Sequence, residues 1–509
     1  MGSMRTSALV ALVFLAAASL SAQSLVNVRG RIIDSDDGSP VAGAWVHLAA
    51  LGLSDSSKAD GSFLLSNAAA IPAISNSPQY DFFSRGGTAR LHLAHAERVS
   101  MRSVNLDGRN VCIVNGRILG PGTFSFRLPL ERGAGVRMVC VQIGNRTEFR
   151  KLLHLDNGGS SFFSRSIAAD RALAKTADAV DTLQVVRHGY VAKKIVVDIY
   201  ADSIAVSLVW RPFVDTSAWN TRIPLNAQID DSSVSYIQDL SVSSQWNFLG
   251  INIKGYSIPV YYCDSASAPK YQVVCTDVTG FRFDRPVPIP DGATPDSLSD
   301  HHICIIDKKL GREWGMWNAV RQTKNTWQCG VGAASDLNGT GVRPPATIAN
   351  PWQLAHGARA SGFPLIAGLI RVGDIKGGRI DHALALAYPH CRSRYFIPPA
   401  STAQGTTADA LPTRGIPMGG LIQLDPSINV DTLTISATGK IIARALQEYG
   451  AYICDYSGAI NLYADGSLAA CAYWDTGVLL TYEISQVFNA AMLRRFRLIK
   501  MGAFYDNGN

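Results

Sequence analysis

The chain has 509 residues, of which 47% are hydrophobic and 17% charged, and its formal net charge is +7. This composition excludes a wholly disordered protein, and the length predicts two or three folded domains. The small basic excess forms no continuous Lys/Arg block, so a nucleic-acid partner is not expected. Beyond the N-terminal apolar run, no stretch has the length and hydropathy of a membrane-spanning helix.

Residues 1–22 have the pattern of a secretory signal peptide. Arg5 precedes an apolar run over residues 8–20, and small residues end the segment at Ala22. A basic start, a short apolar core and a small-residue exit are the features that the export machinery recognises. Met1-Gly2-Ser3 reads as an expression remnant. We therefore expect a secreted or cell-surface protein with no transmembrane segment.

The nine cysteines favour some disulfide bonds in an exported chain. The pairs most local in sequence are Cys112/Cys140 and Cys263/Cys275, and the odd total leaves at least one thiol free. None of the nine has CxxC spacing, so a structural zinc site is not expected.

Residues 25–67 predict short strands separated by tight turns. They carry the pattern G-x-I-x-D at 30–34, P-V-x-G-A-x-V-x-L at 40–48 and A-D-G-x-F at 59–63. This pattern resembles the carboxypeptidase regulatory-like domain, a small β-sandwich of transthyretin-like type. The run stops before a sandwich is complete, and residues 180–210 resemble its closing half. Because an unpaired edge strand invites aggregation, we expect one discontinuous module made of 25–67 and 180–210.

The segment between these halves is itself rich in predicted strands. The stretch Val104-Asn105-Leu106-Asp107-Gly108-Arg109 and the strand expected at 135–141 resemble small Ig-like surface-sorting modules of secreted bacterial enzymes. We expect residues 78–160 to form an inserted β module. Residues 161–179 are rich in Ser and Ala and are expected to be a linker.

From residue 211 to 509 the composition changes to Pro-Gly turns between short β-like runs. The predicted fold class of the whole chain is mainly β. Ig-like and transthyretin-like sandwich modules are followed by a larger β-rich domain, which is a sandwich, jelly roll or irregular barrel with a few short helices. A helical period predicts one helix over 440–449 closed by Gly450, and a shorter helix is expected at 380–387.

Asp300 and His302 form the first candidate pair for chemistry. On a strand, side chains two positions apart point to the same face. A carboxylate beside an imidazole fixes its tautomer and raises its basicity, which suits a general base or a metal ligand. The alternative is a structural hydrogen-bonded pair.

Three further candidates lie downstream. Asp336, in Asp-Leu-Asn-Gly, is a candidate acid, although the motif is also typical of an ordinary Asn-Gly turn. Arg371 ends the apolar run 365–370, so we expect it to pair with Asp336 or Asp374, or to bind a substrate carboxylate. His382 lies at the start of the expected shorter helix, where the helix dipole favours a neutral imidazole; the alternative is a capping role.

Aromatic residues are unusually frequent in the same region. Aromatic faces stack on sugar rings, although many such residues belong to hydrophobic cores. The candidates for substrate contact are Trp314, Trp317, Trp327 and Trp352. The chain has no Gly-x-Ser-x-Gly, P-loop or dinucleotide-binding glycine pattern, which disfavours common esterases, kinases and dehydrogenases.

Ordered blocks between residues 219 and 460 resemble a broad family of uncharacterised secreted bacterial proteins. The resemblance supports His302, Asp336, Arg371 and His382 as site candidates and implies no reaction. The blocks include Ala218-Trp219-Asn220, Ile258-Pro259-Val260, Ser335-Asp336-Leu337-Asn338, Phe363-Pro364-Leu365 and Asp455.

The leading hypothesis is a secreted enzyme that cleaves a polysaccharide. A hydrolase needs two carboxylates flanking the bond, and the candidates are Asp300, Asp336 and Asp455. In a lyase acting on uronic acid, Arg371 would neutralise the carboxylate, His302 or His382 would take the proton, and Tyr395 would act as the acid.

Two other hypotheses remain open. The first is a non-catalytic surface or wall protein that binds glycans through its aromatic residues. The second is an enzyme with a divalent metal held by His302, His382 and an aspartate, since two histidines and a carboxylate form a common ligand set. The sequence does not predict the substrate, the metal content or the oligomeric state.

Overall fold

The computed structural model of the chain describes its modules but not its first 25 residues, so the expected signal peptide lies outside the described part. Most of the expected linker lies outside it too. The described chain is mainly β, with few and short helices, which confirms the predicted class. The described residues are 26–67, 80–85, 88–93, 95–105, 110–127, 135–143, 146–154, 160–163, 180–201, 203–277, 283, 285–345, 356–404 and 415–506.

The chain divides into two compact units, and residues 66–180 belong to the first. Its described strands form a five-stranded sheet in the order β12-β11-β10-β7-β8 and a three-stranded sheet in the order β5-β6-β9. Alternate residues of β6, such as Leu91 and Leu93, are buried in the core of this unit. The strands are β5 (Tyr80–Arg85), β6 (Thr88–Leu93), β7 (Glu97–Asn105), β8 (Asn110–Leu119), β9 (Gly122–Arg127), β10 (Gly135–Ile143), β11 (Arg146–His154) and β12 (Ser160–Phe163).

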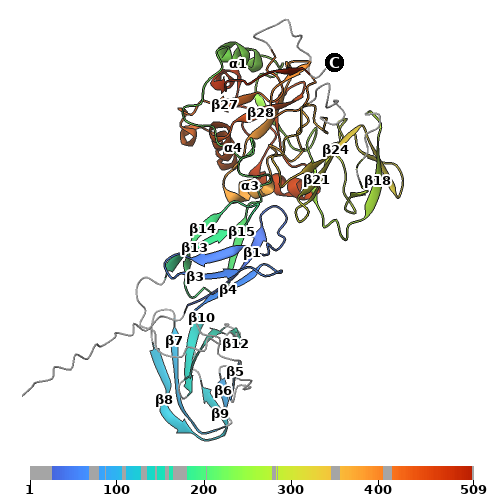
Figure 1. The fold of residues 1–509 in the computed structure, drawn as a ribbon. Coiled ribbons are helices and arrows are strands. Elements are labelled where there is room, and N and C mark those ends of the chain that lie inside the picture. Colours follow the sequence, from blue (N-terminus) through green and yellow to red (C-terminus); the bar gives the residue numbers. More distant parts are fainter. Residues whose placement is uncertain are drawn as a thin grey trace, which may run out of the picture. The chain divides into compact units, whose positions relative to one another are not determined.

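The second unit, residues 28–65 and 181–509, contains a small sandwich and a larger domain. In the sandwich, β15-β1-β4 and β14-β13-β2-β3 form two sheets, and Figure 1 shows strands from the two ends of the module side by side. β15 pairs with β1 in parallel, and β13 pairs with β2 antiparallel. The strands are β1 (Asn27–Asp34), β2 (Trp45–Leu48), β3 (Leu53–Ser56), β4 (Ser62–Ser66), β13 (Val180–Val186), β14 (Lys193–Asp198) and β15 (Ile204–Leu208).

The larger domain is built on a six-stranded sheet in the order β16-β29-β25-β28-β27-β30, with two four-stranded sheets beside it. One of these has the order β17-β20-β21-β24 and the other β19-β18-β23-β22. The strands are β16 (Leu249–Asn252), β17 (Val260–Tyr262), β18 (Lys270–Cys275), β19 (Val287–Pro288), β20 (Ile303–Asp307), β21 (Arg312–Trp317), β22 (Val320–Arg321), β23 (Thr326–Cys329), β24 (Val331–Asp336), β25 (Leu384–Tyr388), β26 (Tyr395–Phe396), β27 (Leu421–Leu424), β28 (Ala451–Tyr456), β29 (Ile460–Tyr463), β30 (Phe496–Leu498) and β31 (Tyr505–Asp506).

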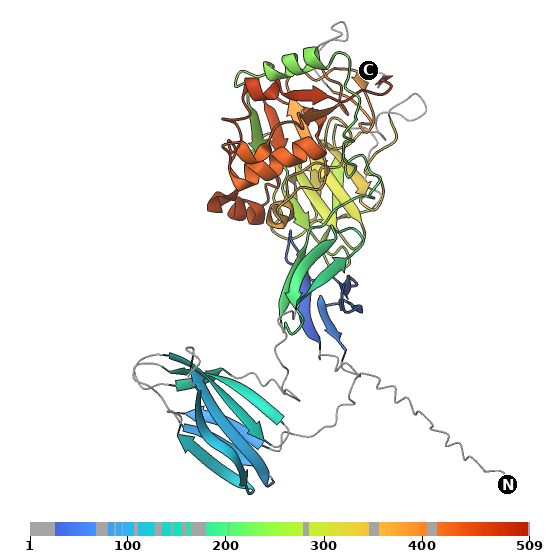
Figure 2. The ribbon, with the colours of Figure 1, turned by 90° about the vertical axis from the view of Figure 1, so that its left-hand side faces the viewer.

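The expected helix with a Gly450 stop is confirmed and packs on the six-stranded sheet (Figure 2). It is α4 (Ala437–Glu448), and it begins where the Ser436 side chain accepts a hydrogen bond from the N–H of Gly439. Ile442 and Leu446 are buried against the core. Gly450 has φ 75°, and a Cβ there would lie 2.4 Å from the carbonyl oxygen of Ile422, so the stop requires glycine.

The prediction of a shorter helix at 380–387 is wrong. The helix of this region, α3 (Val372–Gly377), ends earlier, and strand β25 begins at Leu384. All five residues of β25 are buried, and a short, continuous apolar run does not distinguish a strand from a buried helix.

The other helical segments are short. No helix in the described part of the chain has both the length and the hydropathy needed to cross a membrane. The segments are α1 (Ser233–Ser241), α5 (Leu468–Tyr473), α6 (Ala490–Leu493), a 3₁₀ turn (Val430–Thr432) and a π turn (Trp474–Val478).

The cysteine pairs suggested by sequence proximity are not the pairs that the fold brings together. Cys112 and Cys140 both lie opposite Arg102, on the two sides of β7, so they are about two strand spacings, roughly 10 Å, apart. A disulfide cannot span that distance. Cys275 instead lies opposite Cys329 on the neighbouring strands β18 and β23, with its Sγ 3.0 Å from the Sγ of Cys329.

Candidate functional site

Two cavities in the larger domain adjoin each other, and together they are called the cleft below. The smaller has a volume of about 360 Å³, the larger about 650 Å³, and Asp300, Tyr456 and Tyr463 line both. The smaller cavity also contains His302, Arg359 and Asp455. With Asp277 and His356, which also line it, three carboxyl groups, two imidazoles and a guanidinium surround one cavity of ligand size.

Asp455 is placed in the cleft by an irregularity of strand β28. Leu386 and Ala387 of β25 lie opposite Ile453 and Asp455, so one residue of β28 is left over between them. Such a bulge re-aims the side chains that follow it. Burial, together with the smaller effect of the nearby Asp300 charge, raises the pKa of the Asp455 carboxyl to about 7, although the charge of Arg359 opposes the rise.

Asp300 and His302 are brought together, but not by a strand. β20 begins only at Ile303, and His301 between them has φ 41°. The prediction that strand alternation aligns the pair is therefore wrong, although His302 Nδ1 still lies 4.0 Å from an Asp300 carboxylate oxygen. The Asp300 side chain is 37% exposed, whereas that of His302 is 4% exposed.

The hydrogen bonding of His302 fixes its tautomer. Its Nε2 lies 3.1 Å from the carbonyl oxygen of Ala358, and a carbonyl only accepts, so Nε2 carries a proton. Nδ1 has no hydrogen-bond partner among the described residues and faces Asp300. Burial lowers the pKa of His302, which favours the neutral ring with an unprotonated Nδ1. This atom is therefore set to accept a proton or a hydrogen bond from the Asp300 side.

Arg359 is a site residue that the sequence reasoning missed. It is 1% exposed, and its guanidinium donates to the carbonyls of Ala367 and Leu365 at 2.9 and 3.3 Å. It also lies 4.9 Å from the centre of the Tyr463 ring. The signal was a lone charge just before the apolar block at residue 363, but nothing nearby in sequence identified Asp455 as its electrostatic partner.

Of the four candidate tryptophans, one lines the cleft. Trp317 contributes to the wall of the smaller cavity. Trp314 and Trp327 are 1% and 3% exposed and belong to a hydrophobic core, so they cannot stack on a substrate. Trp352 lies outside the described residues.

Asp336 and Tyr395 do not line either cavity. Asp336 is exposed at the end of β24, and its carboxylate accepts a hydrogen bond from the N–H of Asn338, which is the ordinary turn expected as an alternative. Tyr395 lies on β26, which pairs with β31, and its ring is covered by the guanidinium of Arg394.

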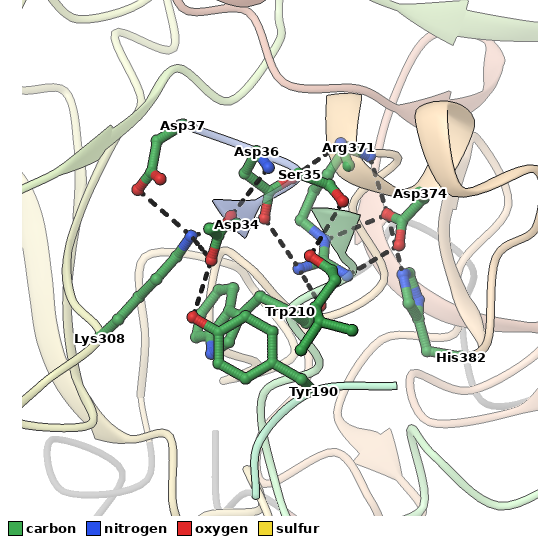
Figure 3. Close-up of polar contacts among 12 residues, drawn as sticks. Asp34, Ser35, Asp36, Asp37, Tyr190, Trp210, Lys308, Arg371, Asp374 and His382 are labelled. Carbon is green, nitrogen blue, oxygen red and sulfur yellow. Dashed lines mark hydrogen bonds and ion pairs between the residues drawn. The ribbon is translucent and has the colours of Figure 1, made fainter. Parts of the chain in front are cut away.

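Arg371 and His382 belong to a different, buried polar cluster (Figure 3). The Arg371 guanidinium donates to both carboxylate oxygens of Asp374, at 2.8 and 3.1 Å, and to the carbonyl of Trp210. His382 Nε2 lies 3.3 Å from the same Asp374 carboxylate. Arg371 Nη1 also lies 3.5 Å from Asp36, which comes from the sandwich. Of the two acids named from the sequence as partners of Arg371, Asp374 is the one that it contacts, whereas Asp336 lies at the exposed end of β24.

The same cluster continues along the sandwich. Lys308 of the larger domain lies 2.7 Å from Asp34 and 3.4 Å from Asp37, and Tyr190 donates to Asp34 at 2.9 Å. Figure 3 shows these acids converging on the two cations. The cluster therefore attaches the sandwich to the larger domain.

The residue sets for a lyase and for a metal site are thus dispersed. His302 lies in the cleft, whereas Arg371 and His382 lie in the cluster of Figure 3 and Tyr395 lies on β26. In the described part of the chain, no three His, Cys, Asp or Glu side chains are grouped closely enough to hold a metal ion.

Comparison of the chain with known protein families, with curated proteins and with solved structures gave no match. The class of the protein is therefore inferred from the cleft itself.

Proposed function

We propose that the protein is a secreted glycoside hydrolase that cleaves a polysaccharide in this cleft. The observation that carries the proposal is the pair Asp455 and Asp300. The pKa of the Asp455 carboxyl is raised to about 7, and the Asp300 side chain, 37% exposed, lines the same cavity. Two carboxyl groups in different environments are what hydrolysis of a glycosidic bond requires.

Asp455 is the general acid in this proposal. Protonated near neutral pH, it donates its proton to the leaving glycosidic oxygen as the bond to the anomeric carbon breaks. In an inverting enzyme, Asp300 takes one proton from a water molecule, and the remaining hydroxyl group bonds to the anomeric carbon. In a retaining enzyme, Asp300 itself first attacks the anomeric carbon, and water then hydrolyses the bond so formed. Either route consumes one water for each bond cleaved.

His302 and Arg359 act through these carboxyl groups. With Nε2–H committed to Ala358, His302 presents an unprotonated Nδ1 4.0 Å from the Asp300 carboxylate, where it can accept a hydrogen bond from the water that Asp300 assists. The charge of Arg359 opposes the rise in the pKa of Asp455, so that the proton remains transferable. The two β modules are proposed to be accessory, aiding spacing or attachment.

The test is a product screen with purified protein on neutral and uronic-acid polysaccharides. Hydrolysis yields new reducing ends without the ultraviolet absorbance of unsaturated sugars, whereas a lyase yields both. Asp455→Asn and Asp300→Asn should each lose turnover while staying folded. Asp336→Asn is the matched control, since Asp336 is exposed outside the cleft. Equal activity of all three variants would contradict the proposed roles.

The second candidate is a non-catalytic glycan-binding protein, which the exposed aromatic residues of the larger cavity favour. A binder would retain glycans without forming reducing ends, and Asp455→Asn would leave its affinity unchanged.

A further inference from the structure

The larger cavity gathers exposed aromatic residues. Among the described residues, seven aromatic side chains are exposed, and four of them, Trp246, Tyr256, Tyr456 and Tyr482, line this cavity. They are between 45% and 66% exposed. Exposed aromatic rings carry a hydrophobic penalty, so their concentration at one cavity indicates a binding surface.

Part of this surface is held in place by neighbouring groups. The Phe248 and Tyr482 rings meet edge to face with centres 5.8 Å apart, so Tyr482 has a fixed support. Asn252 donates to the carbonyl of Tyr256 at 3.1 Å, which restrains that loop. A ring held before binding loses little conformational freedom when a ligand stacks on it.

The side-chain amide of Asn461 lines the larger cavity. Asn461 of β29 is partly exposed, and its side chain makes no hydrogen bond to any other residue that the structure describes. Gly250 lies opposite it on β16, and a Cβ there would come within 2.6 Å of the Asn461 side-chain oxygen. Glycine therefore leaves this amide open to a ligand hydroxyl, which can both donate and accept.

The charged residues that line the larger cavity disfavour the binding of an anionic ligand. Its lining contains one cation, Lys254, and that amine lies 2.6 Å from the carboxylate of Asp475. The Asp300 carboxylate lies at the border with the smaller cavity and would repel a uronate. Aromatic faces with a free amide and no uncompensated cation match the apolar C–H faces and hydroxyl groups of neutral sugars.

We infer that the larger cavity is a set of subsites for a neutral glycan chain, which continues into the smaller cavity where the bond is cleaved. This inference rests on the proposed function and specifies its substrate: an uncharged polysaccharide bound over several sugar units.

The test measures binding separately from cleavage. Full-length Asp455→Asn protein is titrated calorimetrically with cellohexaose, xylohexaose, mannohexaose and hexagalacturonic acid. At least one neutral hexasaccharide should bind, and hexagalacturonic acid should bind about tenfold more weakly or not at all. In that background, Trp246→Ala and Tyr482→Ala should each weaken the neutral ligand by about tenfold. Phe504→Ala, an exposed aromatic outside both cavities, should not change the affinity.

Three outcomes would overturn the inference: tight binding of hexagalacturonic acid, no binding of any neutral hexasaccharide, or unchanged affinity in the Trp246 and Tyr482 variants. Failure of the hydrolase proposal would give a different experimental result. In that case the two aromatic variants would lose affinity as expected, but wild-type protein would release no reducing ends.

Discussion

Replacement of Asp455 by asparagine should make the protein more stable, and increasingly so as the pH rises. The folded carboxyl keeps its proton up to a pKa of about 7, whereas its ordinary value is 3.8. Between these values the folded state binds more protons than the unfolded state, so this residue lowers stability as the pH increases. Asparagine has the same shape and does not ionise.

The size of the effect follows from the two pKa values. Relative to an unfolded carboxyl of ordinary pKa, the raised pKa of Asp455 costs the folded state about 4 kcal/mol at pH 8, where the group is ionised, and about 2 kcal/mol at pH 5, where folding must bind a proton. Both are upper values, because the side chain is partly exposed to the cavity. Asp455→Asn should therefore gain about 2 kcal/mol more stability at pH 8 than at pH 5.

Urea unfolding followed by tryptophan fluorescence measures this difference, since eight of the nine tryptophans lie between Trp210 and Trp474. Asp336→Asn serves as the control, because an exposed carboxylate should change stability by less than about 0.5 kcal/mol at either pH. A gain for Asp455→Asn that is equal at both pH values, or larger at pH 5, would refute the reasoning. A stabilised but inactive variant would be typical of a catalytic group held at the expense of the fold.

Three other predictions concern separate parts of the molecule. If Asp455 is the general acid, kcat/KM should fall as the pH rises through about 7, and a rate that stays constant to pH 9 would remove Asp455 from that role. Arg371→Met should lower the free energy of unfolding by about 3 to 5 kcal/mol, because it leaves the buried Asp374 without its cation. The control Arg379→Met, at a side chain that is 51% exposed, should cost less than about 1 kcal/mol, and equal losses would contradict the structural role of Arg371. Under oxidising conditions Cys275 and Cys329 should form a disulfide, which non-reducing peptide mapping would detect; recovery of Cys263 linked to Cys275 would show that the strand register is wrong.

The sequence predicted features whose evidence is local. Alternation and turn patterns indicated the mainly β class, and the spacing of apolar residues before Gly450 indicated helix α4. Asp300 and His302 were paired because they are two residues apart, and the fold keeps them close by a different route. The sequence spacing therefore predicted that Asp300 and His302 lie close together, but not the backbone conformation that brings them together.

Features that depend on distant parts of the chain were not accessible in this way. Arg371 ends a buried run, which correctly indicated that its charge is used. One of its partners, however, is Asp36, from the first predicted module. Arg359 and Asp455 likewise meet only when β28 reaches the loop before residue 363. The bulge that aims Asp455 arises from strand register, which no single-strand pattern contains.

The interrupted sandwich has a consequence for how the chain acquires its structure during synthesis. β1 and β2 emerge early, but each pairs along one edge with a strand that is made only after the inserted module. The strands of that module pair only with one another in the described sheets, so it has the shorter sequence separations and should fold first. The sandwich then closes when β13 and β15 arrive. Its acids Asp34 and Asp36 obtain their cations later still, when Lys308 and Arg371 have been made. The N-terminal module is thus among the last parts of the protein to become complete.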